Sequence, residues 1–101
     1  MGLMEKYTPH YKLSNIKKLI EAGHVRSTLT ALTNAAALGG DFNDMCNIVK
    51  SLTSSDFYKS MTTHADHRIW QDVYRPVTDL GNVYLKLTVL DDVLIVSFKE
   101  L

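Results

Sequence analysis

The stretch that decides the fold runs from Val83 to Lys99 and reads VYLKLTVLDDVLIVSFK. Its first part, Val83 to Leu90, alternates apolar and polar residues, which is the two-residue period of a strand with one buried face. Asp91-Asp92 then forms a tight turn, and Val93 to Lys99 is apolar on both faces, as expected for an interior strand. The stretch therefore predicts an antiparallel hairpin.

Two more strands are predicted immediately upstream of this hairpin. A short one covers Phe57 to Thr63, and a longer one covers Ile69 to Val77 and stops at Arg75-Pro76, because proline cannot donate a ladder hydrogen bond. Ala65-Asp66 turns the chain between them, and the stretch from Asp79 to Asn82 turns it into the hairpin. These strands and turns predict a C-terminal antiparallel sheet.

The first half of the chain has the 3.6-residue period of helices. The expected N-caps are Ser14, then Ser27 or Thr28, then Asp41, and the first two helices are expected to end at Gly23 and at Gly39-Gly40. The apolar stripes expected to face the core are Leu13, Ile16, Leu19 and Ile20, then Leu29, Leu32, Ala35 and Ala36, then Met45, Ile48, Val49 and Leu52. Helices followed by strands predict an α+β fold, with about three helices on one face of the sheet.

The composition is that of an ordinary globular protein. The chain has 101 residues, which predicts one domain over residues 1–101, with 46% apolar and 22% charged residues. Lys and Arg total 11 and balance 11 Asp and Glu, which excludes a strongly basic coat for nucleic acid but not a local basic face. No apolar run approaches the ~20 residues of a membrane span. The single Cys46 cannot form an internal disulfide, and we expect a cytoplasmic protein.

Strand parity gathers polar residues on the sheet face opposite the apolar one. The set that parity and charge bring together is Lys59, Gln71, Tyr84 and Lys99, with Arg75 or Lys86 nearby. The simplest interpretation is a solvated sheet face, because antiparallel sheets often expose one side. The alternative is an RNA site, in which lysines stabilise the charge that develops when a ribose 2′-oxygen attacks the adjacent phosphorus. A tyrosine and a glutamine can hold a phosphate and a nucleotide there, and such a site needs no metal.

Parity makes two further predictions about the hairpin. Thr88 should look outward with Tyr84, and Lys99 should share a face with Ile95, opposite Phe98. Elsewhere, Trp70 is expected to be a core aromatic rather than a surface on which bases stack.

Two histidines offer a weaker candidate site. His64 and His67 flank Asp66 in the loop between the first two strands, but a metal site needs further ligands, and the chain has neither a Cys pair nor a second histidine pair. Solvated loop histidines are the simpler interpretation, and a general-base role is the remote alternative.

Four runs in the second half are long enough to be specific. They are SDFYKSMTT (55–63), IWQDVYRP (69–76), VYLK (83–86) and DVLIVSFK (92–99). The first half contributes shorter words, such as Thr8-Pro9-His10 and Met45-Cys46-Asn47. From Met4 onward the chain resembles the MqsR family, the motility quorum-sensing regulator toxins of MqsR–MqsA toxin–antitoxin systems.

The resemblance implies a RelE-like fold and a toxin that arrests growth as a metal-independent endoribonuclease without a cofactor. It would cut mRNA, preferring GCU-type sites, through attack of the 2′-hydroxyl. The residues that match the family's active site are Lys59, Gln71, Tyr84 and Lys99, and we expect further RNA contacts from Arg75 and Lys86. The implied partners are single-stranded mRNA and a zinc-containing, MqsA-like antitoxin, with operator DNA contacted only through the toxin–antitoxin complex.

Two other functions remain open at this point. A non-catalytic interaction module would use the exposed sheet face to bind a partner protein or operator DNA, and its expression would not arrest growth. An unrelated RNA-binding fold would bind RNA without cutting it, and its affinity would fall steeply with salt.

Overall fold

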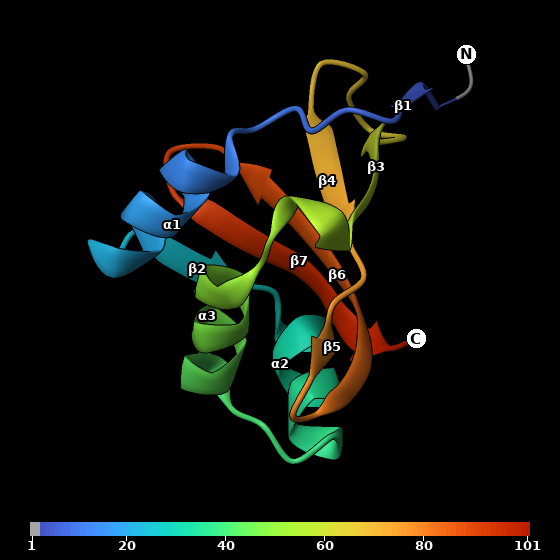
Figure 1. Ribbon diagram of the computed structural model, residues 1–101. Helices are drawn as coiled ribbons and strands as arrows, with labels where there is room; N and C mark the ends of the chain where they lie inside the picture. Colours follow the sequence, from blue (N-terminus) through green and yellow to red (C-terminus); the bar gives the residue numbers. More distant parts are fainter. Residues whose placement is uncertain (1–2) are drawn as a thin grey trace.

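The structure is a computed structural model that describes residues 3–101 (Figure 1). Its elements are, in chain order, β1 (Glu5–Lys6), α1 (Leu13–Glu21), β2 (Val25–Ser27), α2 (Leu29–Ala37), α3 (Phe42–Ser51), the short 3₁₀ helix η1 (Ser54–Asp56), β3 (Phe57–Thr62), β4 (Trp70–Tyr74), β5 (Val77–Thr78), β6 (Gly81–Val89) and β7 (Val93–Glu100). The three helices pack against a seven-stranded sheet, which confirms the α+β class.

The strands follow the order β1-β3-β4-β6-β7-β2, and β5 pairs with β6. All pairings are antiparallel except that of β2 with β7, which is parallel. The predicted C-terminal strands pair antiparallel, as expected, whereas the parallel strand β2 from the first half of the chain was not predicted. A strand of three residues is too short to show the two-residue period in its sequence. Its direction depends on how α1 leads the chain back to the sheet. β2 also makes β7 an interior strand, as its sequence predicted.

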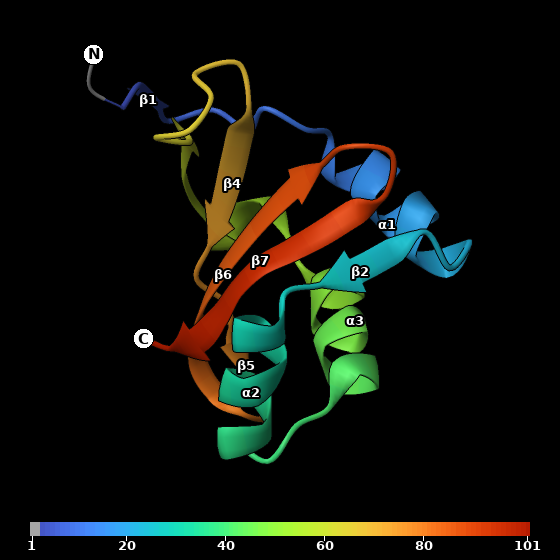
Figure 2. The ribbon, with the colours of Figure 1, turned by 180° about the vertical axis from the view of Figure 1, so that it is seen from behind.

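The helices leave one side of the sheet open. α1 and α3 lie together in front of the sheet in Figure 1 and behind it in Figure 2. α2 lies beside β7, where the Thr28 amide donates to the carbonyl of Ile95 at 3.1 Å and the Thr28 hydroxyl donates to that of Val96 at 3.0 Å. None of the helices in residues 3–101 crosses the other face of β4 and β6 (Figure 2). The core between helices and sheet includes Ile16, Met45, Val49, Leu85, Ile95 and Phe98.

Local capping explains where two of the helices begin. The Thr28 hydroxyl accepts a hydrogen bond from the Ala31 amide at 3.1 Å, and Asp41 and Asp44 form a capping box at the start of α3. The predicted N-cap Ser14 was wrong. Lys12 occupies that position without a side-chain cap, because Leu13 already belongs to the helix.

The apolar stripe predicted for α2 was also partly wrong. Ala31 and Ala35 are buried, whereas Leu29 is 79% exposed and Ala36 is exposed as well. Small side chains face β7 because α2 runs close beside that strand.

The long strand predicted for Ile69 to Val77 is divided in two. β4 ends at Tyr74, and after Pro76 the chain pairs with β6 as the separate strand β5. The prediction that Thr88 looks outward was wrong. Thr88 is buried. Its hydroxyl donates a hydrogen bond of 2.8 Å to the Trp70 carbonyl and lies within hydrogen-bond distance, 3.2 Å, of the Tyr11 hydroxyl.

A bulge in β3 separates two residues that simple alternation would place together. Phe57 pairs with Tyr74 and Lys59 pairs with Val73, so Tyr58 is the extra residue. Phe57 packs against the core, with its ring 5.5 Å from that of Tyr74. Lys59 is thereby turned to the open face, because a bulge redirects the side chains that follow it.

A second bulge has the same effect in β7. Leu87 pairs with Ile95 and Lys86 with Ser97, which leaves Val96 as the extra residue. Ile95 and Phe98 are both in the core, while Lys99 lies opposite Tyr84 on the open face. The predicted grouping of Lys99 with Ile95 was therefore wrong, because simple alternation takes no account of the bulge.

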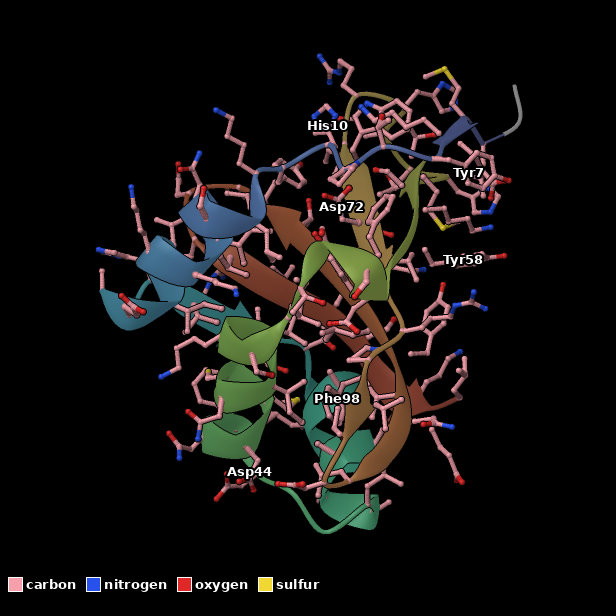
Figure 3. The ribbon with its side chains drawn as sticks, in the orientation of Figure 1. Tyr7, His10, Asp44, Tyr58, Asp72 and Phe98 are labelled. Atoms are coloured by element: carbon pink, nitrogen blue, oxygen red, sulfur yellow. The ribbon has the colours of Figure 1, made fainter. Side chains whose placement is uncertain are left out.

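Residues 4–11, termed the N-terminal strap, run across the ends of β3 and β4. The Thr62 amide donates to the Met4 carbonyl, and the Met4 amide donates to the Thr62 hydroxyl, each at 2.9 Å. Further along, the fully buried Asp72 accepts hydrogen bonds from the His10 amide at 3.1 Å and the Tyr11 amide at 3.0 Å. The Ser60 hydroxyl donates to the same carboxylate at 2.6 Å. Figure 3 shows Asp72 beneath the strap at His10.

The strap also explains the environment of Trp70, which is half-buried and lies outside the core cluster. The prediction of a core aromatic was wrong. The His10 ring stacks on Trp70 with 5.4 Å between centroids, and the Lys6 ammonium lies 4.3 Å from the ring centre.

Candidate functional site

The open side of the sheet carries a group of cations around one tyrosine. Lys59 on β3 pairs with Val73 on β4, which pairs with Lys86 on β6, and Tyr84 on β6 pairs with Lys99 on β7. Adjacent strands are ~4.8 Å apart, so the backbones of Lys59 and Lys86 are about 10 Å apart. We term Lys59, Tyr84, Lys86 and Lys99 the basic face.

Val73 forms the floor of the basic face. It is fully buried but does not belong to the core cluster beneath the helices. The long lysine side chains on either side of it can cover apolar surface with their methylene groups and keep their charged ends in water. The lysines of the basic face thus lie beside a buried apolar residue.

Tyr84 lies between two lysine side chains. The Lys99 ammonium is 5.1 Å and the Lys86 ammonium 5.8 Å from the centre of its ring. Burial raises the pKa of the Tyr84 hydroxyl, although the nearby charge of Lys59 opposes this effect. The hydroxyl therefore stays protonated at neutral pH and can donate a hydrogen bond to an anion.

The three lysines of the basic face act on one another. Burial lowers the pKa of Lys86, and the positive charges of Lys99 and Lys59 lower it further. Cations held this close repel one another, and an anion placed between them relieves the repulsion. The chain has a formal net charge of zero, so this local concentration of charge is what suits it to a phosphodiester.

Lys59 has a partner that the sequence did not reveal. Its ammonium donates a hydrogen bond of 2.5 Å to the carboxylate of Glu5, and this bond raises the pKa of Lys59. Glu5 lies on β1, where it pairs with Met61. A two-residue strand far away in the sequence has no period by which this contact could have been predicted.

Arg75 and Gln71 lie at the margins of the basic face. The Arg75 guanidinium stacks 3.8 Å from the centre of the Tyr58 ring, and the Lys59 ammonium lies 5.3 Å from the same ring. Tyr58 and Tyr7 both project from this edge of the molecule in Figure 3.

Gln71 is half-buried opposite Met61 and lies two residues along β4 from Val73, which is about 7 Å further along the strand. Of the predicted site residues, the structure thus brings together Lys59, Tyr84, Lys86 and Lys99 and leaves Gln71 at the far end.

The other candidate features lie away from the basic face. The loop that holds His64 and His67 is closed by an ion pair of 3.0 Å between Arg68 and Asp66. Among residues 3–101, His, Cys, Asp and Glu side chains form no group of three or more that could hold a metal ion. A cavity of about 460 Å³ opens between α3 and the β5–β6 turn, where Leu80 lines it. In the same range, no helix combines the length and apolar character needed to cross a membrane.

Comparison with known proteins agrees with the resemblance found in the sequence. A family described as "Motility quorum-sensing regulator, toxin of MqsA" matches residues 8–100. The chain belongs to the MqsR toxin family. It is 65% identical over 97 residues to the mRNA interferase toxin MqsR of Escherichia coli (strain K12). That alignment covers 96% of this chain and 99% of the relative. Glu5 precedes residues 8–100, and the alignment with the E. coli toxin extends beyond that range.

Proposed function

We propose that this member of the MqsR family is an mRNA interferase, an endoribonuclease that cuts single-stranded mRNA at the basic face and arrests growth. One observation carries the proposal: three lysines from separate strands gather near Tyr84 on a sheet face that the helices leave open. A related protein named mRNA interferase toxin MqsR supports it.

In the proposed reaction the ribose 2′-oxygen attacks the adjacent phosphorus in line. The new bond joins the 2′-oxygen to phosphorus, and the bond from phosphorus to the 5′-oxygen breaks. The 2′-hydroxyl loses its proton, and the leaving 5′-oxygen gains one. The products are a 2′,3′-cyclic phosphate and a 5′-hydroxyl, and the proposal assigns no step to a metal ion or cofactor.

The residues would divide this work according to their charge and position. Lys59 and Lys99 would stabilise the charge on the phosphoryl oxygens, and one of them would help protonate the leaving oxygen. Tyr84 would hold the phosphate or assist the proton transfer, and Gln71, further along β4, would orient the nucleotide. We assign contacts with the flanking RNA backbone to Arg75 and Lys86.

The proposal extends to the cellular context of the reaction. The toxin would act in the cytoplasm at GCU-type sites. An MqsA-like antitoxin would neutralise it, and the complex of the two proteins would bind operator DNA.

The direct test is cleavage of one purified transcript in excess chelator, with the cut ends mapped and their chemistry determined. We expect cyclic phosphate ends with the native protein, a loss of ~10²–10³ in rate with Lys59→Ala and Tyr84→Phe, and native rates with the matched surface variant Glu21→Gln. In cells, induced expression should arrest growth and a co-expressed antitoxin should restore it. Loss of activity on chelation, or full activity in both site variants, would refute the proposal. Binding without cleavage would favour the RNA-binding alternative.

A further inference from the structure

The N-terminal strap contacts the basic face directly through Glu5 and Lys59. Only 19% of the Lys59 side chain is exposed, and its ammonium lies 2.5 Å from the Glu5 carboxylate. The strap is fixed on both sides of Glu5, by the hydrogen bonds of Met4 with Thr62 and of Asp72 with the amides of His10 and Tyr11. Glu5 is therefore held at Lys59 by the fold rather than reaching it from a loose end.

The chemistry of an ammonium group explains how one carboxylate can assist the site without occupying it. A lysine ammonium has three N–H donors. If one donates to Glu5, two remain for the oxygens of a phosphate, and the direction of the first sets the direction of the others. The negative charge of Glu5 also offsets the repulsion between Lys59 and Lys86. This matters because burial and the charges of Lys99 and Lys59 already disfavour the charged form of Lys86.

We infer that Glu5 is a positioning residue of the nuclease site, which orients the Lys59 ammonium toward the bound phosphate and balances its charge against the other lysines. This inference rests on the proposed function. It adds to the site a residue of the N-terminal strap, which pairs with Met61 on β3. The hydrogen bond to Glu5 is also the largest cause of the raised pKa of Lys59, so removing the carboxylate should let Lys59 lose its proton at lower pH.

Several other titratable groups lie around Lys59 and must be separated from this effect. They are Tyr7 from the strap, Tyr58 from β3, and Tyr84 and Lys86 from β6. β4 presents the uncharged Val73. Because the tyrosines also titrate at alkaline pH, the rate profile has to be accompanied by a direct titration of the Lys59 side chain.

The experiment compares the full-length native protein with Glu5→Gln, which keeps the size of the side chain and removes its charge. Glu21→Gln, an exposed change of the same kind at the end of α1, is the control. Single-turnover cleavage of a mapped transcript is measured from neutral to alkaline pH. The lysine side-chain signals are titrated by NMR, with the Lys59 signal identified by its absence in Lys59→Met. Thermal unfolding confirms that each variant is folded.

We expect Glu5→Gln to cut roughly threefold to tenfold more slowly at neutral pH, in keeping with the loss of a hydrogen bond to a charged group. The alkaline fall in its rate and the Lys59 titration should both move to lower pH, and Glu5→Asp should recover part of the loss. A native pH profile in Glu5→Gln, or a faster enzyme, would overturn the inference, the latter because the carboxylate would then be blocking Lys59. Failure of the native protein to cut RNA would instead overturn the proposed function, while the NMR titration would still test the effect of Glu5 on Lys59.

Discussion

The Lys99 ammonium lies 5.1 Å from the centre of the Tyr84 ring, and the two residues are directly paired across β6 and β7. Neither residue belongs to the core, since Lys99 is exposed and Tyr84 is half-buried. Changes at either position can therefore be tested for their effect on chemistry with little effect on folding.

Tyr84→Phe and Lys99→Met should each reduce single-turnover cleavage by ~10²–10³, the usual effect of removing one donor to a developing negative charge. The midpoint of thermal unfolding should stay close to the native value. Lys18→Met, on the exposed side of α1, serves as the control for loss of a lysine. Cleavage at the native rate in both site variants would rule out the assigned roles.

Lys86 should behave differently, because its charged form is disfavoured in the folded protein. Lys86→Met keeps the length of the side chain and removes a half-buried charge that Lys59 and Lys99 repel. We expect this variant to bind RNA more weakly and yet to unfold at a higher temperature at neutral pH. Filter binding and calorimetry would measure the two effects, and a lower melting temperature would contradict the prediction.

The gain in stability expected from Lys86→Met should depend on pH in a definite direction. The folded-state pKa of Lys86 lies below its ordinary value of 10.5, so between the two values the unfolded chain binds more protons. The native protein therefore gains stability from Lys86 as pH rises through this window. The advantage of Lys86→Met should be greatest at neutral pH and should shrink toward pH 10.5 in denaturant titrations. An advantage that grows with pH would show that the charge of Lys86 is not its cause.

Asp72 should be important for stability. Its buried carboxylate accepts hydrogen bonds from the amides of His10 and Tyr11 and from the hydroxyl of Ser60. Asp72→Ala leaves these donors without a partner and should lower the free energy of unfolding by about 2–4 kcal/mol. Asp72→Asn, which keeps an acceptor oxygen, should lose less. The exposed Asp91→Ala should stay within about 0.5 kcal/mol of the native value in the same urea titration.

Gly40 leaves room for the side chain of its neighbour Leu80. A Cβ at this position would lie 2.5 Å from Cδ1 of Leu80. Gly40→Ala should therefore cost at most about 1 kcal/mol, because the end of the half-buried Leu80 side chain can shift. In a Leu80→Ala background the same change should cost almost nothing, because the clash is gone. A double-mutant cycle of unfolding free energies measures this coupling, and additive values would exclude it.

The parts of the fold that could be predicted are those set by neighbours in the sequence. Thr28 and Asp41 cap helices through hydrogen bonds to residues three positions on, so their role is visible in the sequence. The parallel strand Val25–Ser27 could not be predicted in this way, because its pairing with β7 depends on how α1 packs. Ser14 is a good N-cap by residue type, but the helix has already begun at Leu13.

The site shows the same division. Tyr84 and Lys86 on β6 follow strict alternation, so the sequence alone predicts that they share a face. The positions of Lys59 and Lys99 depend in addition on bulges at Tyr58 and Val96, which no residue type announces. Glu5 was missed because it reaches the site only through tertiary pairing of β1 with β3. What the sequence lacked was the contacts between distant segments.

The two bulges make the length of β3 and β7 as important as their composition. Deleting a single codon at Tyr58 or Val96 would remove the extra residue and leave its neighbours on the faces they already occupy, because consecutive residues of a regular strand alternate. Deleting Ser60 instead would use up the bulge in β3 and turn Lys59 toward the helices. In a scan of one-codon deletions, Tyr58 and Val96 should therefore tolerate the loss better than other positions in the same two strands.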